Sequence, residues 1–183
     1  EDKERNGGEN AYAAMMKLGE SVPAGADGLV ALPYFSGERT PINDPCASGA
    51  LFGLRLHHDK RHIYRAFLEG IAYSIAQNIL VLEENQVEIR RLTATGGGTK
   101  NRLLLQILAD VTGREIFVPK VTIGASYGDA VLAMIGCGEI PSFEQAGKLF
   151  RYASSYKPDK ERHLFYREGL QRFTEFYKST KMM

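Results

Sequence analysis

Three consecutive glycines, Gly96, Gly97 and Gly98, stand between a stretch with strand character and a stretch with helical periodicity. Bare backbone at such a turn can approach a ligand closely, and the first N–H groups of the following helix point toward it. The turn lacks the G-x-G-x-x-G spacing of dinucleotide sites. It is also no phosphate loop, because Lys100 follows Thr99 in the wrong order. The residues alone therefore leave two interpretations open: a ligand-binding turn, or a tight β–α connection.

A second candidate is the loop from Ser36 to Pro45, which is rich in charges and carries two prolines. Binding residues concentrate on loops held by a rigid scaffold, so Glu38, Arg39 and Asp44 are functional candidates. The alternative is a solvated loop with a local Glu38–Arg39 ion pair.

Two other sets of polar residues, three histidines and Glu69, are weaker candidates for a metal or catalytic site. The group His57, His58 and His62 lacks a convincing further ligand at helical spacing, so surface histidines leading into a helix are favoured over a metal site. Glu69, inside a long apolar helix pattern, is expected to be solvated or bonded to nearby backbone rather than catalytic.

The glycine turn would be positioned by a strand over 92–95 and a helix over 101–113, in which Gly113 is placed for a left-handed C-cap. Strands alternating with helices indicate a layered α/β domain. We expect further strands over 29–35, 49–56 and 114–119. Helices are expected over 11–19, 62–85, 125–137, 142–150 and 159–179. The second of these helices carries an apolar stripe at Ile63, Phe67, Ile71, Ile75 and Ile79. Ala66, Leu68, Ala72, Ala76, Leu80 and Leu82 widen it, which predicts a central helix packed on a sheet. The last helix is expected to bury Tyr166, Leu170, Phe173 and Tyr177.

Composition limits the function classes. With 23 basic and 22 acidic side chains in 183 residues, the chain presents no electrostatic case for nucleic acid or an anionic membrane. It contains no apolar run near the roughly 20 residues of a membrane-spanning helix, and no signal peptide is recognised at its start. Cys46 and Cys137 match no metal spacing, which favours free thiols and a cytoplasmic location.

Five motifs, in order, resemble the C-terminal domain of the FGGY carbohydrate kinases, most closely the xylulokinase and gluconokinase subgroups. The resemblance covers roughly residues 25–141. It predicts a division into a lead-in with a short helix (1–24) and a C-terminal ATP-binding portion (25–183). The matching stretches are 32–34 with 36–41 and 44–45; Gly49, Gly53 and Leu54; 65–72; Gly96 to Gly98 with Lys100, Asn101 and 106–113; and Gly124 with Ala125.

The resemblance implies a ribonuclease-H-like, actin-like ATPase fold, with a mixed sheet flanked by helices. ATP and a sugar would bind in the cleft between two such domains. Gly97 and Gly98 would lie against the adenine of ATP, Asn101 would hydrogen-bond the base, and Gly96 would permit the turn. An amide side chain suits this role because it both donates and accepts.

In the same comparison the loop residues Glu38, Arg39 and Thr40 would shape the cleft. Asn43 departs from the Trp of many relatives, which weakens any assignment of the sugar; a xylulose-like ketose is the expectation. The family's catalytic Asp and phosphate hairpin have no counterpart here. We therefore expect no catalytic residue in this chain, a need for Mg²⁺ and a sugar-binding N-terminal domain, and no kinase activity from residues 1–183 alone.

Two other classes stay open from the sequence: a non-catalytic, actin-like nucleotide-sensing module, and an interaction domain that docks through its aromatic last helix. An open edge of the sheet is also expected, and this edge would allow a homodimer.

Overall fold

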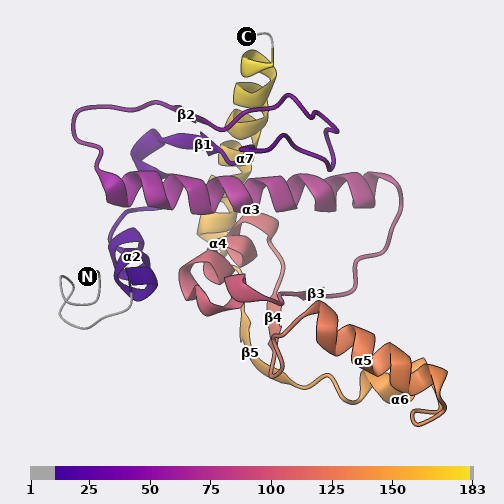
Figure 1. Cartoon of the computed structure of the whole chain (residues 1–183). Coiled ribbons are helices and arrows are strands. Elements are labelled where there is room, and N and C mark those ends of the chain that lie inside the picture. The colour runs from indigo at the N-terminus through magenta and orange to yellow at the C-terminus, as the bar shows by residue number, and fades with distance from the viewer. Residues whose placement is uncertain (1–10, 182–183) are drawn as a thin grey trace.

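The computed structural model describes residues 11–181, so the first ten residues of the predicted lead-in (1–24) lie outside the described residues. Figure 1 shows α3 crossing the middle of the molecule, with β1, β2 and part of α7 on one side and α4 on the other. In chain order the helices and strands are α2 (Ala11–Glu20), β1 (Val30–Leu32), β2 (Ala50–Phe52), α3 (Lys60–Glu84), β3 (Leu92–Thr93), α4 (Arg102–Thr112), β4 (Ile116–Pro119), α5 (Ala125–Gly136), α6 (Phe143–Gly147), β5 (Tyr152–Tyr156) and α7 (Lys160–Thr180).

The two sheets are small. β1 and β2 pair antiparallel, with Val30 opposite Phe52, and Gly53 ends the second strand with a φ of 88°. The second sheet has the order β3-β4-β5. Its first pair is parallel and its second pair is antiparallel, so the predicted mixed sheet flanked by helices is confirmed. Among the helices of residues 11–181, none has the length and hydropathy that a membrane-spanning segment requires.

Strand β5 is the element that sequence patterning missed. Its residues, Tyr-Ala-Ser-Ser-Tyr, include two serines and only two residues of strong strand propensity. The strand forms because β4 supplies a partner, with Ile116 opposite Tyr156. The register shifts between Val118 and Pro119, where proline has no N–H to offer the ladder.

Helix α3 begins and ends close to its predicted bounds. The predicted wide apolar face is confirmed at Ala66, Leu68, Ala72, Ala76 and Ile79, and is wrong at Leu80 and Leu82, which are exposed. Ile75 is 39% exposed, and Ile63, Phe67 and Ile71 are only partly buried. The face that packs inward includes three alanines and Gly70, which let β1 and α4 approach the helix axis. The buried apolar residues of α3 are Ala66, Leu68, Ala72, Tyr73, Ala76 and Ile79.

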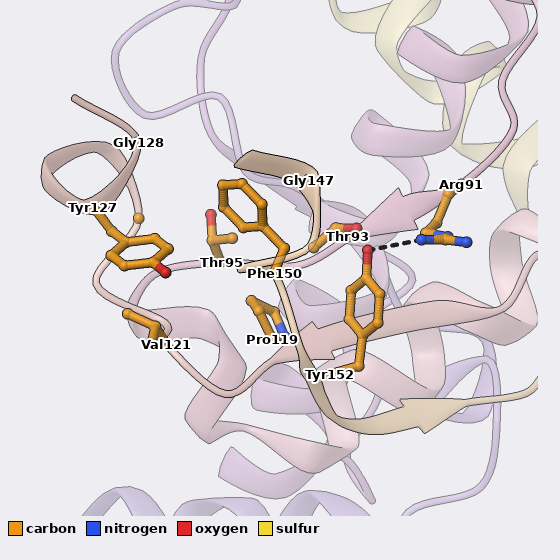
Figure 2. Close-up of a pocket in the computed structure, with 11 residues that line it drawn as sticks. Arg91, Thr93, Thr95, Pro119, Val121, Tyr127, Gly128, Gly147, Phe150 and Tyr152 are labelled. Atoms are coloured by element: carbon orange, nitrogen blue, oxygen red, sulfur yellow. Dashed lines mark hydrogen bonds between the residues drawn. The ribbon is translucent and has the colours of Figure 1, made fainter. Parts of the chain in front are cut away.

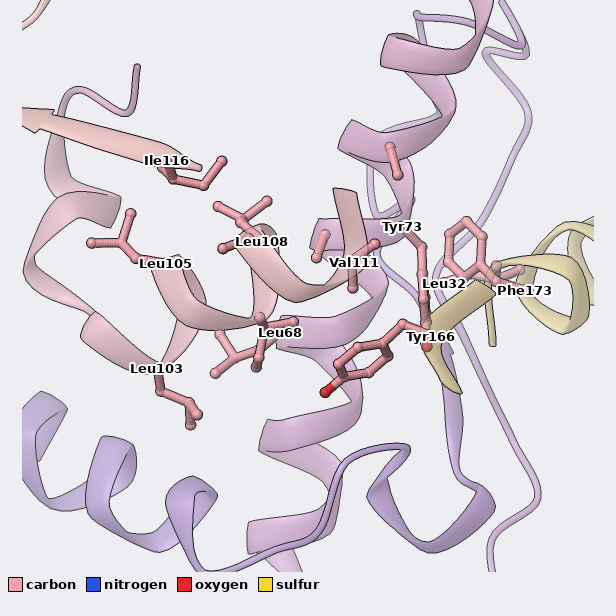
Figure 3. Close-up of a cluster of buried hydrophobic side chains, with 14 of the residues drawn as sticks. Leu32, Leu68, Tyr73, Leu103, Leu105, Leu108, Val111, Ile116, Tyr166 and Phe173 are labelled. Carbon is pink, nitrogen blue, oxygen red and sulfur yellow. The ribbon is translucent and has the colours of Figure 1, made fainter. Parts of the chain in front are cut away.

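The main core joins α3, α4, β4 and α7 (Figure 3). In α7 the predicted buried face is confirmed at Tyr166 and Phe173, which are fully buried, and at Tyr177, which is nearly so, whereas Leu170 is only partly buried. Phe173 contacts the rings of both Tyr34 and Tyr73. Helix α4 packs into the same core, because its residues Leu103, Leu105 and Leu108 belong to the cluster that α3 and α7 form.

Candidate nucleotide site

The glycine turn leaves the sheet at the end of β3. Gly96 has φ 79° and ψ −164°, a conformation open almost only to glycine, and its N–H donates to Thr122 O at 2.9 Å. A short 3₁₀ helix, η2 (Gly97–Lys100), follows. Gly97 has no positive φ, and a Cβ placed on it would meet no atom within 4 Å. Gly96 is therefore required by the backbone, whereas the bare surface of Gly97 faces open space.

Asn101 is the N-cap of α4. Its Oδ1 accepts a hydrogen bond from the Leu104 N–H at 3.1 Å, and its Nδ2 donates to the Tyr64 hydroxyl at 2.9 Å. At the far end, Gly113 adopts the predicted left-handed conformation, with φ 65°. The predicted helix is thus confirmed, and its first residue carries a half-buried amide fixed on two sides.

A cavity of about 580 Å³ opens beside the turn. This volume falls in the range of small-molecule sites, roughly 300–1,000 Å³. Of the predicted site residues, Gly97 and Asn101 line the cavity, and Gly96 and Gly98 do not. The lining residues come from α2, α3 and the turn: Tyr12, Ala13, Met16, Tyr64, Gly97, Lys100 and Asn101. Lys100 is the one charged residue among them, so the wall is mainly apolar with a few polar groups.

Helix α2 forms one wall of this cavity because its C-terminal end is fixed to α3 and α4. A Cβ at Gly19 would lie 2.9 Å from both Leu103 and Tyr64, so the helix approaches both closely. The Arg102 Nε also pairs with Glu20 Oε1 at 2.9 Å. No local pattern predicts the wall formed by α2 and α3, because it depends on contacts between helices far apart in the chain.

Glu69 is only 2% exposed, so of the two expected alternatives, solvated or bonded to backbone, the second is confirmed. Its Oε1 accepts from the backbone N–H of Gly25 at 2.9 Å, as one of the predicted alternatives required. The same oxygen accepts from Arg65 Nε at 2.7 Å and from the Tyr166 hydroxyl at 2.8 Å. Burial raises the pKa of the Glu69 carboxyl, and the Arg65 guanidinium opposes that rise. We call Arg65, Glu69 and Tyr166 the buried triad; it ties α3 to α7.

The loop containing Glu38, Arg39 and Thr40 is folded on itself. The Glu38 and Asp44 backbones exchange hydrogen bonds of 2.9 and 2.8 Å, and Glu38 Oε1 accepts from the Thr40 N–H at 3.2 Å. Among the ion pairs within residues 11–181, none joins Glu38 to Arg39, so the local pair of the alternative interpretation does not form. None of these loop residues lines the cavity.

The base of that loop is fixed to α7. Tyr177 donates its hydroxyl to Asp44 Oδ2 at 2.6 Å, and burial together with this bond raises the pKa of Tyr177 to about 12. The hydrogen bond from Tyr177 also lowers the pKa of Asp44. Asp44 thus anchors the loop to the last helix.

His62, predicted at the surface, is 8% exposed. Its side chain and that of Asp59 form a reciprocal capping box at the start of α3. Among the described residues, no group of three or more His, Cys, Asp and Glu side chains is placed to hold a metal ion. His62 is therefore explained by the helix it caps.

A second cavity, of about 400 Å³, lies between the β3-β4-β5 sheet and α5 (Figure 2). Arg91 lies over the rings of Phe117 and Tyr152 and donates to the Tyr152 hydroxyl at 3.0 Å. Tyr127 and Phe150 close the other side, edge to face. This cavity contains none of the four predicted nucleotide-binding residues.

Comparison with known proteins assigns the chain to a family. The model of the FGGY family of carbohydrate kinases, C-terminal domain, matches residues 1–137. Xylulose kinase of Staphylococcus epidermidis is 33% identical over 174 residues, which are 94% of this chain and 35% of the relative. Gluconokinase of Bacillus licheniformis is 33% identical over 91% of this chain and 33% of its own length.

Solved structures of carbohydrate kinases match the same chain. The crystal structure of xylulose kinase from Rhodospirillum rubrum superposes with a TM-score of 0.80 at 35% identity, over 92% of this chain and 34% of that one. The chain belongs to the FGGY family of carbohydrate kinases, which are phosphotransferases with an actin-like fold, and it corresponds to their C-terminal domain. It spans about a third of the length of these relatives.

Proposed function

We propose that this chain forms the ATP-binding part of a kinase that phosphorylates a sugar hydroxyl, with a xylulose-like ketose as substrate. The observation that carries the proposal is the cavity beside the glycine turn, where Gly97 offers bare backbone and Asn101 an oriented amide. The relatives named xylulose kinase and gluconokinase support the same reaction class.

The cavity suits a flat base on chemical grounds. Gly97 leaves room for a ring against the backbone. Asn101 uses one N–H and one lone pair within the chain, and an amide has two of each, so a donor and an acceptor remain for the ligand. Gly96 sets the turn, and Gly98 completes it. The loop of Glu38, Arg39 and Thr40 would shape the cleft at a distance from the base.

Phosphoryl transfer needs more than this cavity. A base must accept the sugar proton, and Mg²⁺ would neutralise charge on the transferred phosphoryl group. We assign neither role to a residue of this chain, and we propose that an N-terminal domain like that of the relatives supplies the base and the sugar site. Residues 25–183 would be the nucleotide-binding portion, with α2 closing one side of the cavity.

Substitution of Gly97 by valine tests the proposal. The φ at Gly97 is compatible with a side chain and the space is open, so the fold should survive while the side chain fills the place of the base. We expect the affinity of the complete protein for ATP to fall about tenfold or more, equal to about 1.4 kcal/mol. Isothermal titration calorimetry with ATP measures the affinity, and thermal melting checks the fold.

Gly136→Val is the matched control, because a Cβ at Gly136 also meets nothing within 4 Å and the residue lines neither cavity described above. If both variants bind ATP like the parent protein, the cavity is not the nucleotide site. A panel of ketoses, polyols and aldonates with Mg²⁺ then identifies the acceptor in the complete protein. Residues 1–183 alone should release no ADP.

A further inference from the structure

Tyr64 lines the cavity beside the glycine turn, and the proposed function gives its side chain no role. It projects from α3, and its half-buried ring packs against the main core and close to Gly19 of α2. Both Tyr64 and Asn101 line the cavity, so the hydrogen bond between them lies at its wall. The direction of that bond determines what the tyrosine can offer to a ligand.

The direction is set by the backbone. The Leu104 N–H can only donate, so the Asn101 atom that faces it is the carbonyl oxygen, Oδ1. Nδ2 is therefore the atom that faces Tyr64, and it donates to the phenolic oxygen. An oxygen that accepts from the amide keeps its own hydrogen for another partner. Within residues 11–181 the Tyr64 hydroxyl makes only the bond with Asn101, so its hydrogen has no acceptor in the described chain.

We propose that Tyr64 is a base-recognition residue of the nucleotide cavity, whose hydroxyl donates a hydrogen bond to an unprotonated ring nitrogen of adenine. This inference rests on the proposed ATP-binding function. Backbone, amide and phenol would then form one directed chain: Leu104 N–H to Asn101 Oδ1, Asn101 Nδ2 to Tyr64 O, and Tyr64 O–H to the base. Adenine ring nitrogens are acceptors that such a donor can contact.

Tyr64→Phe removes the hydroxyl and keeps the ring that packs on Gly19. We expect the affinity of the complete protein for ATP to fall about three- to tenfold, the usual worth of one neutral hydrogen bond. If Tyr64 only holds Asn101 in place, its substitution would also lower the affinity for ATP. The loss of affinity alone therefore does not distinguish base recognition from support of Asn101. The deciding probes are 1-deaza-, 3-deaza- and 7-deaza-ATP, each of which replaces one ring nitrogen by C–H.

The parent protein should bind one of the three analogues about three- to tenfold more weakly than ATP. Tyr64→Phe should bind that analogue as well as it binds ATP, since the contact is already lost; this is the signature of a coupled pair. Tyr127→Phe, whose ring lies in the other cavity, should match the parent protein throughout. The inference is overturned if Tyr64→Phe binds ATP normally, or if it weakens ATP and all three analogues by one common factor.

The two proposals fail in different ways. If the complete parent protein binds no ATP in the calorimeter, the proposed function falls, and the role of Tyr64 falls with it. If Gly97→Val weakens ATP binding while Tyr64→Phe does not, the cavity is the nucleotide site and only the role of Tyr64 is wrong.

Discussion

Helices α3 and α5 are both rich in small residues, yet their surroundings are opposite. In α3 the residues Ala66, Ala72 and Ala76 are buried, and a Cβ on Gly70 would overlap the carbonyl oxygen of Ala31. In α5 Ala125, Ala130 and Ala133 are exposed, and a Cβ on Gly128 would meet no atom within 4 Å. Small residues thus permit close packing without ensuring that a partner is present.

Figure 1 shows the consequence, with α5 and α6 extending away from the body that α3 organises. Only Val131 of α5 is buried, in a small cluster with Ile140 and Ala146. Leu132 and Met134 are 55% and 42% exposed. We therefore expect substitutions around α3 to change the global free energy of unfolding and those in α5 to act locally.

The largest effect should come from the buried triad. Glu69→Ala removes the partner of a buried guanidinium and leaves Arg65 uncompensated, so the free energy of unfolding should fall by about 3–5 kcal/mol. Urea denaturation followed by circular dichroism measures this change. Glu88→Ala is the control, because its ion pair with Arg90 is largely exposed and should contribute at most about 0.5 kcal/mol.

A double variant, Arg65→Met with Glu69→Leu, sharpens this test. If the loss comes from an unpaired buried charge, removing both charges should cost less than removing Glu69 alone. Equal losses would show instead that the packing around α3, and not the ion pair, gives this region its stability.

A smaller loss is expected from Gly70→Ala. The added methyl group meets the backbone of β1, which cannot move aside as a flexible side chain can. Overpacking of this kind costs about 1–3 kcal/mol, against a helix-propensity gain of less than about 1 kcal/mol. The same denaturation experiment should show lower stability; an unchanged midpoint would mean that β1 and α3 separate readily.

These contrasts also explain which features could be predicted from the sequence. The strand, glycine turn and helix, the Gly113 C-cap of α4 and most of the buried face of α7 depend on local residues, and the predictions for them are confirmed. Strand β5 depends on β4, and the cavity wall at Tyr64 depends on α2 and α4, so neither has a local signature. The roles of the loop residues 38–40, the homodimer and the cytoplasmic location stay predictions.

The smallest effect, with the opposite sign, is expected at Gly128. It lies inside α5 without a positive φ, so alanine should stabilise the helix by about 0.5–1 kcal/mol through propensity alone. Because α5 barely contacts the core, the global midpoint of residues 1–183 should hardly move. Slower hydrogen exchange of the α5 amides should report the gain. The same substitution in the complete protein tests the contrast between α3 and α5 directly. Destabilisation there would show that Gly128 packs against a partner lying beyond residues 11–181. The small residues of α5 would then serve close packing, as those of α3 do.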